Sequence, residues 1–466
     1  MTRPGDRPAT YREVLAVREF AALYAAQITS LLGDQVARVA LSLLVLNRSD
    51  NPLLAALAFA STYLPWIIGG PILSPLADRR PRRAVMVSCD VVRAVAVGAM
   101  ALPGVPLWLL FGLLFGASLL MAPFEAARAA TLPDVLTGDR YVVGSALANI
   151  TTQFGQVAGL VLGGALVGVL TPRGALAVDA ATFAISATFI ATGVRHRPAA
   201  SRHAAPTLRA DIVDGARVVF RSSVLRSILL LAWAGATFAM VQEGLAPTYA
   251  RRLGYGPLAT GWLVAASPLG FVVGALVLGR MMPSARLRLM LPLAAASFVP
   301  LVVTAVHPPL WGAIALWAAS GAGLAYQIPA NATFMVAVPP EARGRAFGLA
   351  QTGIQALQGL SIAGGGGLAL LLEPHQVIAI AGIGGLVSVG LIAALWPARQ
   401  IDAVYAVPGE DDLGVLGDVP IESSAPLPEL RTWSGPYPLT PRRRVLIARL
   451  FHHDVPAATR DSSTRS

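Results

Sequence analysis

The chain has 466 residues, of which 55% are hydrophobic and only 13% are charged. Soluble domains usually carry about 25% charged residues, so this composition leaves too little polar surface for a soluble protein. The formal net charge of +11 rests on arginine alone, because the chain contains no lysine, and the arginines lie between apolar blocks. That placement disfavours nucleic-acid binding and favours a protein that spans a membrane.

Apolar blocks recur along the chain, and each is long enough to cross a bilayer as a helix of about 20 residues. Turn-forming or charged residues separate the blocks. The first block runs on past Leu46, so we expect a retained helix rather than a cleaved signal peptide. The pattern predicts an all-α polytopic membrane protein of about twelve transmembrane helices, near residues 19–46, 52–77, 84–103, 106–130, 142–170, 174–194, 224–249, 256–280, 287–306, 309–338, 346–372 and 376–397.

The arginines near the ends of the predicted spans, including those before the first span and directly after the last, are distributed unequally between the two sides of the membrane. One side carries 22 of them and the other carries 4. Loops rich in arginine stay in the cytoplasm, so the first side is predicted to be cytoplasmic, together with both termini.

A polar, basic stretch separates six predicted spans from six more, and two prolines and a glycine recur across it at one offset of 206 residues. The pairs are Pro123 and Pro329, Pro133 and Pro339, and Gly138 and Gly344. Repeated halves are typical of secondary transporters. We predict a cytoplasmic N-terminal tail (1–18), an N-terminal six-helix bundle (19–194), a cytoplasmic linker (195–223), a C-terminal six-helix bundle (224–397) and a mostly disordered cytoplasmic tail (398–466).

Two segments outside the predicted bundles are amphipathic. Residues 211–221 of the linker are expected to form an interfacial helix. Residues 441–453 of the tail are basic, and they either lie on the anionic inner membrane surface or form a disordered basic stretch.

The loop after the second predicted span carries an acid among arginines. Asp78, Arg79, Arg82 and Arg83 match the major facilitator signature G-x-L-A-D-R-x-G-R-R, and Ser74 and Pro81 replace its two glycines. The loop therefore resembles the gating loop of that family, in which the acid and arginines lock the cytoplasmic helix ends in one state. The alternative is that the arginines of this loop only follow the general excess of positive charge in cytoplasmic loops and have no gating role.

Four glycines in the fifth predicted span resemble the family's antiporter motif. They are Gly155, Gly159, Gly163 and Gly164, with Leu160 where proline is usual. Glycines four residues apart let a neighbouring helix approach closely, so ordinary helix packing is the alternative interpretation. The missing proline leaves antiport open.

The N-terminal half resembles the drug and siderophore exporters related to macrolide-efflux proteins and the enterobactin exporter. The similar runs are residues 30–35, 90–94, 122–128 and 179–183, and residues 344–348 are a looser match in the C-terminal half. The span 106–130 lacks the arginine that many drug–proton antiporters carry, since residues 107–121 have no charge.

This resemblance implies the major facilitator fold in the bacterial inner (cytoplasmic) membrane. It implies a proton-coupled exporter of small hydrophobic or amphipathic compounds, as in multidrug efflux, working by alternating access. Its expected partners are the substrate, protons and the lipid bilayer, and it is expected to act as a monomer without cofactor or nucleic acid. A siderophore or lipid exporter of the same fold is one alternative, and a non-transporting receptor or scaffold is another. The sequence shows no nucleophile–base pair or metal cluster, so we do not expect an enzyme.

Ionisable side chains inside spans are costly and are therefore functional candidates. The proton-coupling candidates are Asp34, Arg38, Asp90, Arg93 and Glu243. Asp34 is the deepest acid of its half, and Arg38 lies one helical turn further on, where it can face the same side and pair with Asp34. Glu125 and Arg128 are expected to act in gating with the Asp78 loop. The alternative for the acid–arginine pairs is a structural ion pair, and the alternative for Glu243 is that it merely lies at the exit.

Neutral polar side chains within the spans are candidates for a substrate cavity. They are Gln153, Gln156, Gln242, Gln327, Asn331, Gln351, Gln355 and Gln358. The alternative is that they join helices by hydrogen bonds.

Overall fold

The computed structural model describes residues 9–63, 65, 80–197, 208–339, 342–398 and 400–401, and every regular element among them is a helix. Met1–Tyr405 forms one compact unit, to which all the helices below belong. The second unit, Ala406–Ser466, lies outside the described residues, as does the amphipathic segment 441–453.

The first half of the chain forms the N-terminal bundle. Pro52 begins α3 after Asn51, whose side chain accepts hydrogen bonds from the amides of Leu53 and Leu54. Asp50 ends the preceding helix with a left-handed backbone (φ 50°). The helices are α1 (Tyr11–Leu15), α2 (Arg18–Ser49), α3 (Pro52–Ala60), α6 (Arg82–Ala101), α7 (Leu107–Leu119), α8 (Met121–Val135) and α9 (Asp139–Gly193).

The second half forms the C-terminal bundle, preceded by a helix in the linker. That helix, α10 (Leu208–Arg221), joins the C-terminal bundle through an ion pair between Asp214 and Arg345 at 3.2 Å. The bundle contains α11 (Ser223–Phe238), α12 (Val241–Arg252), α13 (Pro257–Gly279), α14 (Pro283–Arg288), α15 (Met290–Val303), η1 (Thr304–Val306), α16 (Leu310–Gly323), η2 (Leu324–Tyr326), α17 (Gln327–Ala337), α18 (Arg343–Leu368) and α19 (Pro374–Ala394).

Seven helical stretches of the described chain are long and apolar enough to cross a membrane. They are Arg18–Ser49, Arg82–Ala101, Leu107–Val135, Asp139–Gly193, Ser223–Arg252, Pro257–Gly279 and Pro374–Ala394. The stretch Asp139–Gly193 holds two predicted spans, because the backbone of Thr171 (φ 71°, ψ 162°) interrupts its helix at the expected break. The 3-10 turn η2 likewise divides the predicted span 309–338 into α16 and α17.

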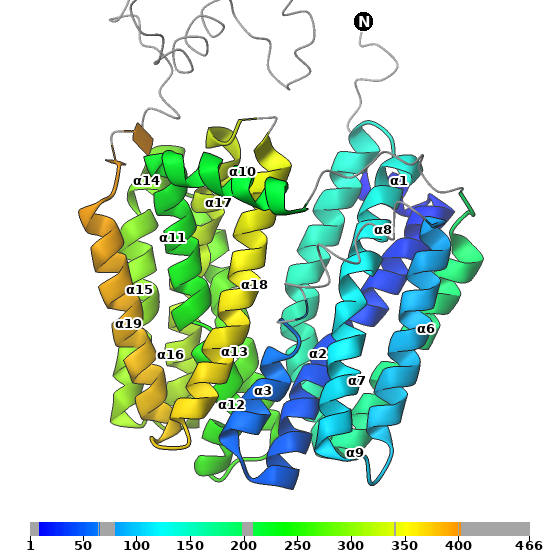
Figure 1. Ribbon diagram of the computed structural model, residues 1–466, viewed down its shortest axis with the longest axis horizontal. Coiled ribbons are helices and arrows are strands. Elements are labelled where there is room, and N and C mark those ends of the chain that lie inside the picture. Colours follow the sequence, from blue (N-terminus) through cyan, green and yellow to red (C-terminus); the bar gives the residue numbers. More distant parts are fainter. Residues whose placement is uncertain are drawn as a thin grey trace, which may run out of the picture. The chain divides into compact units, whose positions relative to one another are not determined.

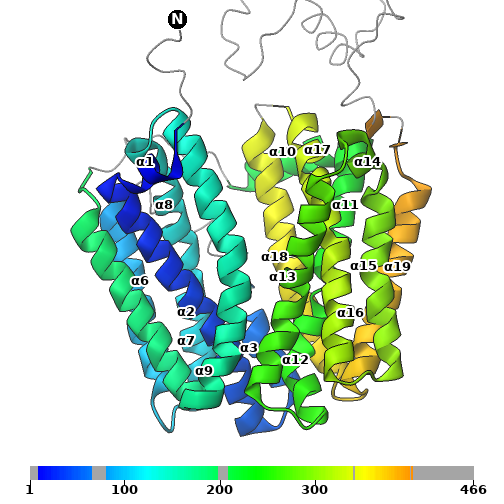
Figure 2. The same ribbon diagram turned by 180° about the vertical axis from the view of Figure 1, so that it is seen from behind.

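The two bundles meet at the end of the molecule where α3 and α12 lie (Figure 1). Asp50 and Arg251 form an ion pair there at 2.9 Å, joining the end of α2 to the end of α12. Helices α9 and α13 touch through glycines, since a Cβ added at Gly164 would lie 2.8 Å from the Cα of Gly261. From this end the ribbons of the bundles separate toward the end that carries α1 and α10 (Figure 2).

The glycine contact generates a prediction about this closed end. Gly164→Val should separate α9 from α13, because the valine side chain would press against the backbone of α13. Overpacking of this kind costs about 1–3 kcal/mol, which changes a two-state equilibrium about 5- to 150-fold. We expect a short bis-methanethiosulfonate reagent to cross-link Asp50→Cys with Arg251→Cys efficiently, and Gly164→Val to lower that yield several-fold.

The background for this measurement is Cys89→Ala, which removes the chain's single, buried cysteine. Gly168→Val is the matched control on the same helix, because a Cβ at Gly168 meets nothing within 4 Å. Equal cross-linking of the two valine variants would show that the glycine contact does not hold this end closed.

Candidate functional site

A buried guanidinium lies among acids inside the N-terminal bundle. Arg93 in α6 donates a hydrogen bond to the carboxylate of Asp34 in α2 at 2.7 Å, and it lies 3.9 Å from Asp90 one turn away. The side chains of Arg93 and Asp90 are 4% and 0% exposed, whereas Asp34 is 19% exposed. Asp34 is therefore the member of this ion-pair cluster that is open to exchange with its surroundings.

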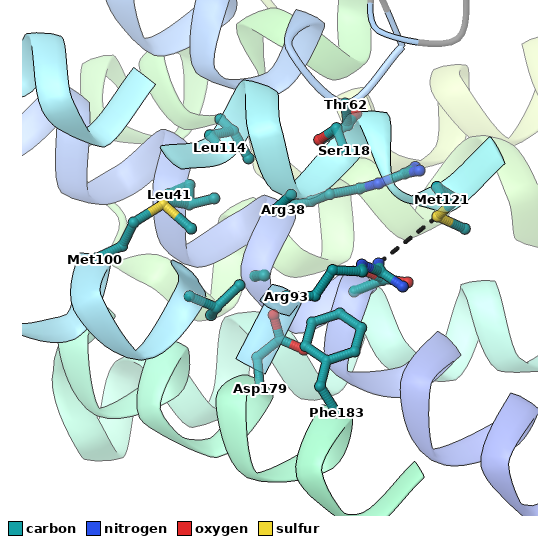
Figure 3. Close-up of a pocket in the computed structure, with 14 residues that line it drawn as sticks. Arg38, Leu41, Thr62, Arg93, Met100, Leu114, Ser118, Met121, Asp179 and Phe183 are labelled. Atoms are coloured by element: carbon teal, nitrogen blue, oxygen red, sulfur yellow. Dashed lines mark hydrogen bonds and ion pairs between the residues drawn. The ribbon is translucent and has the colours of Figure 1, made fainter. Parts of the chain in front are cut away.

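Helix α9 completes the environment of Arg93. The Ser186 hydroxyl donates to Asp90 at 2.6 Å, and the Phe183 ring lies 3.9 Å below the Arg93 guanidinium carbon. Asp179 lies beside Arg93 and Phe183 (Figure 3). Its Oδ1 accepts from the Thr182 hydroxyl at 3.2 Å, and its Oδ2 is buried without a hydrogen-bond partner among the residues that the structure describes. Burying charged groups is costly even when they are paired, so such a cluster inside a membrane protein is a candidate functional site.

Two cavities meet at this cluster. One has a volume of about 50 Å³ and the other about 240 Å³. Both are lined by Asp34, Arg38, Arg93 and Met121. The larger cavity is formed by side chains of α2, α6, α8 and α9, namely Gln27, Ser30, Leu31, Asp34, Gln35, Arg38, Arg93, Met121, Phe124, Glu125, Arg128, Thr152 and Gln156.

Arg38 lies one turn after Asp34 but has a different partner. Its guanidinium donates to the Tyr63 hydroxyl at 3.3 Å and lies 5.1 Å from the centre of the Tyr63 ring. The structure thus pairs Asp34 with Arg93 rather than with Arg38. The reason is position, because α6 brings Arg93 directly against Asp34 while Arg38 extends across the smaller cavity (Figure 3).

Glu125 and Arg128 form an ion pair within α8. The Arg128 guanidinium donates to Glu125 at 2.6 and 3.1 Å and to the Gln27 side chain of α2 at 2.9 Å. Both residues line the larger cavity. Glu243, the remaining acid among the coupling candidates, is buried in α12 and lines neither cavity.

Two of the gating candidates, Asp78 and Arg79, lie outside the described residues. Arg82 at the start of α6 pairs with Asp134 of α8 at 2.7 Å and donates to the Ala130 carbonyl at 2.7 Å. Arg83 donates to the Ala191 carbonyl of α9. These arginines therefore tie the beginning of α6 to the ends of its two neighbours.

The four motif glycines face two neighbours. Gly155 and Gly159 lie against Leu31 and Gln35 of α2, and a Cβ at Gly163 would lie 3.0 Å from the Cα of Val36. Gly164 faces α13 of the other bundle. The spacing of these glycines thus lets α9 approach α2 closely within the N-terminal bundle. At Gly164 it lets α9 approach α13 of the other bundle.

The neutral polar candidates separate into two groups. Gln156 lines the larger cavity, and the side chain of Gln153 lies outside the described residues. The other six belong to the C-terminal bundle, and neither cavity includes them: Gln242, Gln327, Asn331, Gln351, Gln355 and Gln358. Gln242 is fully buried with an amide that has no hydrogen-bond partner in the described chain, whereas Asn331 and Gln351 are exposed.

Sequence reasoning missed three residues that the structure brings into these contacts. Tyr63 holds Arg38, Asp134 holds Arg82, and Asp179 lies beside Arg93. Asp179 had a usable signal, because it is an acid inside the predicted span 174–194. Tyr63 and Asp134 had none, since their partners are distant in sequence.

Comparisons with known sequences concern almost the whole described chain. Residues 23–256 and 244–451 match the Major Facilitator Superfamily. The uncharacterized MFS-type transporter YfiS of Bacillus subtilis is 26% identical over 387 residues, which cover 80% of this chain and 92% of that protein. Macrolide efflux protein A of Streptococcus pyogenes is 23% identical over 101 residues, which cover 21% of this chain and 25% of that protein.

Solved transporters share the fold at low sequence identity. A POT family transporter in complex with 5-aminolevulinic acid has a TM-score of 0.66 and 11% identity, covering 82% of this chain and 96% of that one. A bacterial homolog of the human lysosomal transporter Spinster, in an inward-facing and unoccupied conformation, has a TM-score of 0.66 and 13% identity. The match covers 86% of this chain and 100% of that one. The predicted all-α fold of about twelve transmembrane helices in two six-helix bundles is confirmed, and the chain belongs to the Major Facilitator Superfamily.

Proposed function

We propose that this membrane transporter is a proton-coupled exporter of small hydrophobic or amphipathic compounds that works by alternating access. We place it in the bacterial inner membrane as a monomer with both termini in the cytoplasm. The observation that carries the proposal is the ion-pair cluster of Arg93, Asp34 and Asp90 at the meeting point of two cavities. The partial similarity to a macrolide efflux protein supports the direction of transport.

Proton exchange at this cluster depends on competition between a proton and the Arg93 guanidinium for the Asp34 carboxylate. A proton on Asp34 would weaken its ion pair with Arg93, and Arg93 would keep Asp90 and the Phe183 ring as neighbours. Breaking a buried pair without compensation costs about 3–5 kcal/mol. A change in solvation around Asp34, or a small shift of α6 against α2, therefore decides whether the Asp34 carboxylate binds a proton or pairs with the Arg93 guanidinium.

Alternating access requires that the contact between the bundles be reversible. Contacts at the α3 and α12 end include one exposed ion pair, Asp50 with Arg251, the close approach of Gly164 to Gly261, and the packing of α3 against Gly366 of α18. The exposed ion pair stabilises by only about 0–1 kcal/mol, so helix packing rather than charge opposes opening at this end. In our proposal the Asp78 loop, with Arg79, Arg82 and Arg83, locks the cytoplasmic ends when the outer end is open, and Glu125 with Arg128 acts as its partner.

Export is the first property to test. A strain that lacks this protein and a complemented strain are compared across a panel of drugs, dyes and siderophores, with and without an uncoupler. The proposal requires at least one compound that the complemented strain excludes, with exclusion lost when the uncoupler is added. Exclusion that persists after uncoupling would remove the proton from the mechanism.

The coupling acid is tested by substitution at Asp34. Asp34→Asn keeps the size of the side chain and removes its charge, so efflux driven by a pH gradient should be abolished while substrate binding stays measurable. Asp34→Glu should retain part of the activity, because the carboxylate is kept. The measurement is proton-driven uptake of the excluded compound into everted membrane vesicles.

Glu19→Gln is the matched control for this substitution. It removes an acid of the same helix, α2, that is also paired with an arginine, Arg197, but that lines neither cavity. Gradient-driven transport should survive in this variant. Normal transport and a normal uncoupler response in Asp34→Asn would instead make the Asp34–Arg93 pair structural, with Asp90 and Glu243 as the next candidates.

The orientation is tested with reporter fusions. Because 22 of the arginines near the span ends fall on one side against 4 on the other, reporters inserted within residues 195–223 and after residue 399 should both report the cytoplasm. A periplasmic signal from either position would overturn the proposed topology.

A further inference from the structure

Arg38 differs from the other arginines of the larger cavity in its partners. Arg93 is held by Asp34 at 2.7 Å, and Arg128 is held by Glu125 at 2.6 Å. In the part of the chain that the structure describes, Arg38 has neutral partners, namely the hydroxyl and the ring of Tyr63, and no carboxylate within 4.0 Å. The wall of the larger cavity thus carries two acids, Asp34 and Glu125, and three arginines. Among the described residues, the arginine of this wall without an ionic partner is Arg38.

A guanidinium in such a place has unused capacity for an anion. It presents five N–H donors, and the Tyr63 hydroxyl occupies one of them. Charge-assisted hydrogen bonds to a carboxylate or sulfonate are about twice as strong as neutral ones, and they gain further where water is scarce. Arg38 lines the larger cavity of about 240 Å³, so a ligand bound there can reach it.

The remaining lining defines the rest of the ligand. Leu31, Met121 and Phe124 provide an apolar surface in the larger cavity, whereas Gln35, Thr152 and Gln156 provide hydrogen-bonding groups. Asp34 and Glu125 are each held by their own arginine, so they repel an incoming anion less than free carboxylates would.

We infer that Arg38 is an anion-binding residue and that the compound bound in this cavity is a small amphipathic organic anion, with an acidic head group on Arg38 and an apolar body against Leu31, Met121 and Phe124. The inference rests on the proposed function, because it assigns the head group of the exported compound. It separates Arg38 from the coupling role that the sequence assigned to it together with Asp34.

The acid that acts on Arg38 from the other bundle is Glu243 of α12, which is buried and forms no ion pair with it in the described chain. A purely structural alternative follows from this neighbour, in which Arg38 serves to neutralise Glu243. Under that alternative, removing either charge should have the same effect on ligand binding. Under our inference, removing Arg38 weakens anion binding, and removing Glu243 leaves it unchanged or stronger.

The test is equilibrium binding to the full-length protein in nanodiscs, without any gradient. The probes share one fluorophore and differ in charge: dansylglycine is an anion, its methyl ester is neutral, and dansylcadaverine is a cation at neutral pH. Empty nanodiscs correct for partitioning into lipid. We expect saturable binding of dansylglycine that exceeds binding of the ester, and Arg38→Gln should weaken it about 10- to 150-fold, as expected for loss of a charge-assisted contact. Arg38→Lys should retain part of the affinity.

Three variants serve as controls. Arg128→Gln changes the cavity charge by the same amount but removes a guanidinium already paired with Glu125, so its effect should be smaller than that of Arg38→Gln. Tyr63→Phe removes the hydroxyl that occupies Arg38 and should leave anion binding intact or stronger. Glu243→Gln should behave like Tyr63→Phe.

Several results would overturn the inference. These are equal binding of the ester and the anion, preference for the cation, no saturable binding of dansylglycine, or equal losses in Arg38→Gln and Glu243→Gln. If no Arg38 variant folds, the wild-type preference between dansylglycine and its ester decides. Failure of gradient-driven export with intact anion binding would count against the proposed function alone, because the binding measurement uses no gradient.

Discussion

The constraint on which the N-terminal bundle depends is the cost of placing charge inside a membrane. Arg93 is almost fully buried, and it is stabilised by Asp34, by Asp90 and by the ring of Phe183. These partners come from three helices, α2, α6 and α9, so the charge network also fixes how those helices lie against one another. The helices approach closely enough because Gly33 of α2 has no side chain, and a Cβ there would overlap Asp179 and Thr182. Close packing at small residues and the pairing of a buried charge thus stabilise the same helix contacts.

The sequence predicted the fold well because hydropathy and loop charge are strong signals over a chain of this length. The breaks at Asp50 and Thr171 were visible as turn-forming stretches, and the structure shows a residue with a positive φ at each. Predicted spans such as 309–338 were less accurate, because the turn at η2 is apolar and leaves no mark in composition. Charge and periodicity locate helices along the chain, but they do not reveal such interruptions.

The site was predicted as a set of residues but not as a set of contacts. Spacing along one helix suggested Asp34 with Arg38, whereas the structure pairs Asp34 with a residue 59 positions away. Contacts of this kind depend on the rotation of α6 against α2, which one sequence does not encode in any local pattern. The same reason explains why Tyr63, Asp134 and Asp179 gained their importance only from the structure. The acids and arginines of the spans could be named in advance, and their partners could not.

The position of α3 has a consequence for how the protein is made. Its residues Ala55, Ala56, Ala58 and Phe59 are all buried, and Gly366 of α18 lets the backbone of that helix approach Leu53 closely. Helix α18 begins about 290 residues after α3 begins. At a synthesis rate of about 5–20 residues per second, α3 waits roughly 15–60 s in the membrane before its partner emerges. During that interval lipid or the insertion machinery must cover the face that α18 later occupies, which makes the first half of the chain an incomplete folding unit during translation.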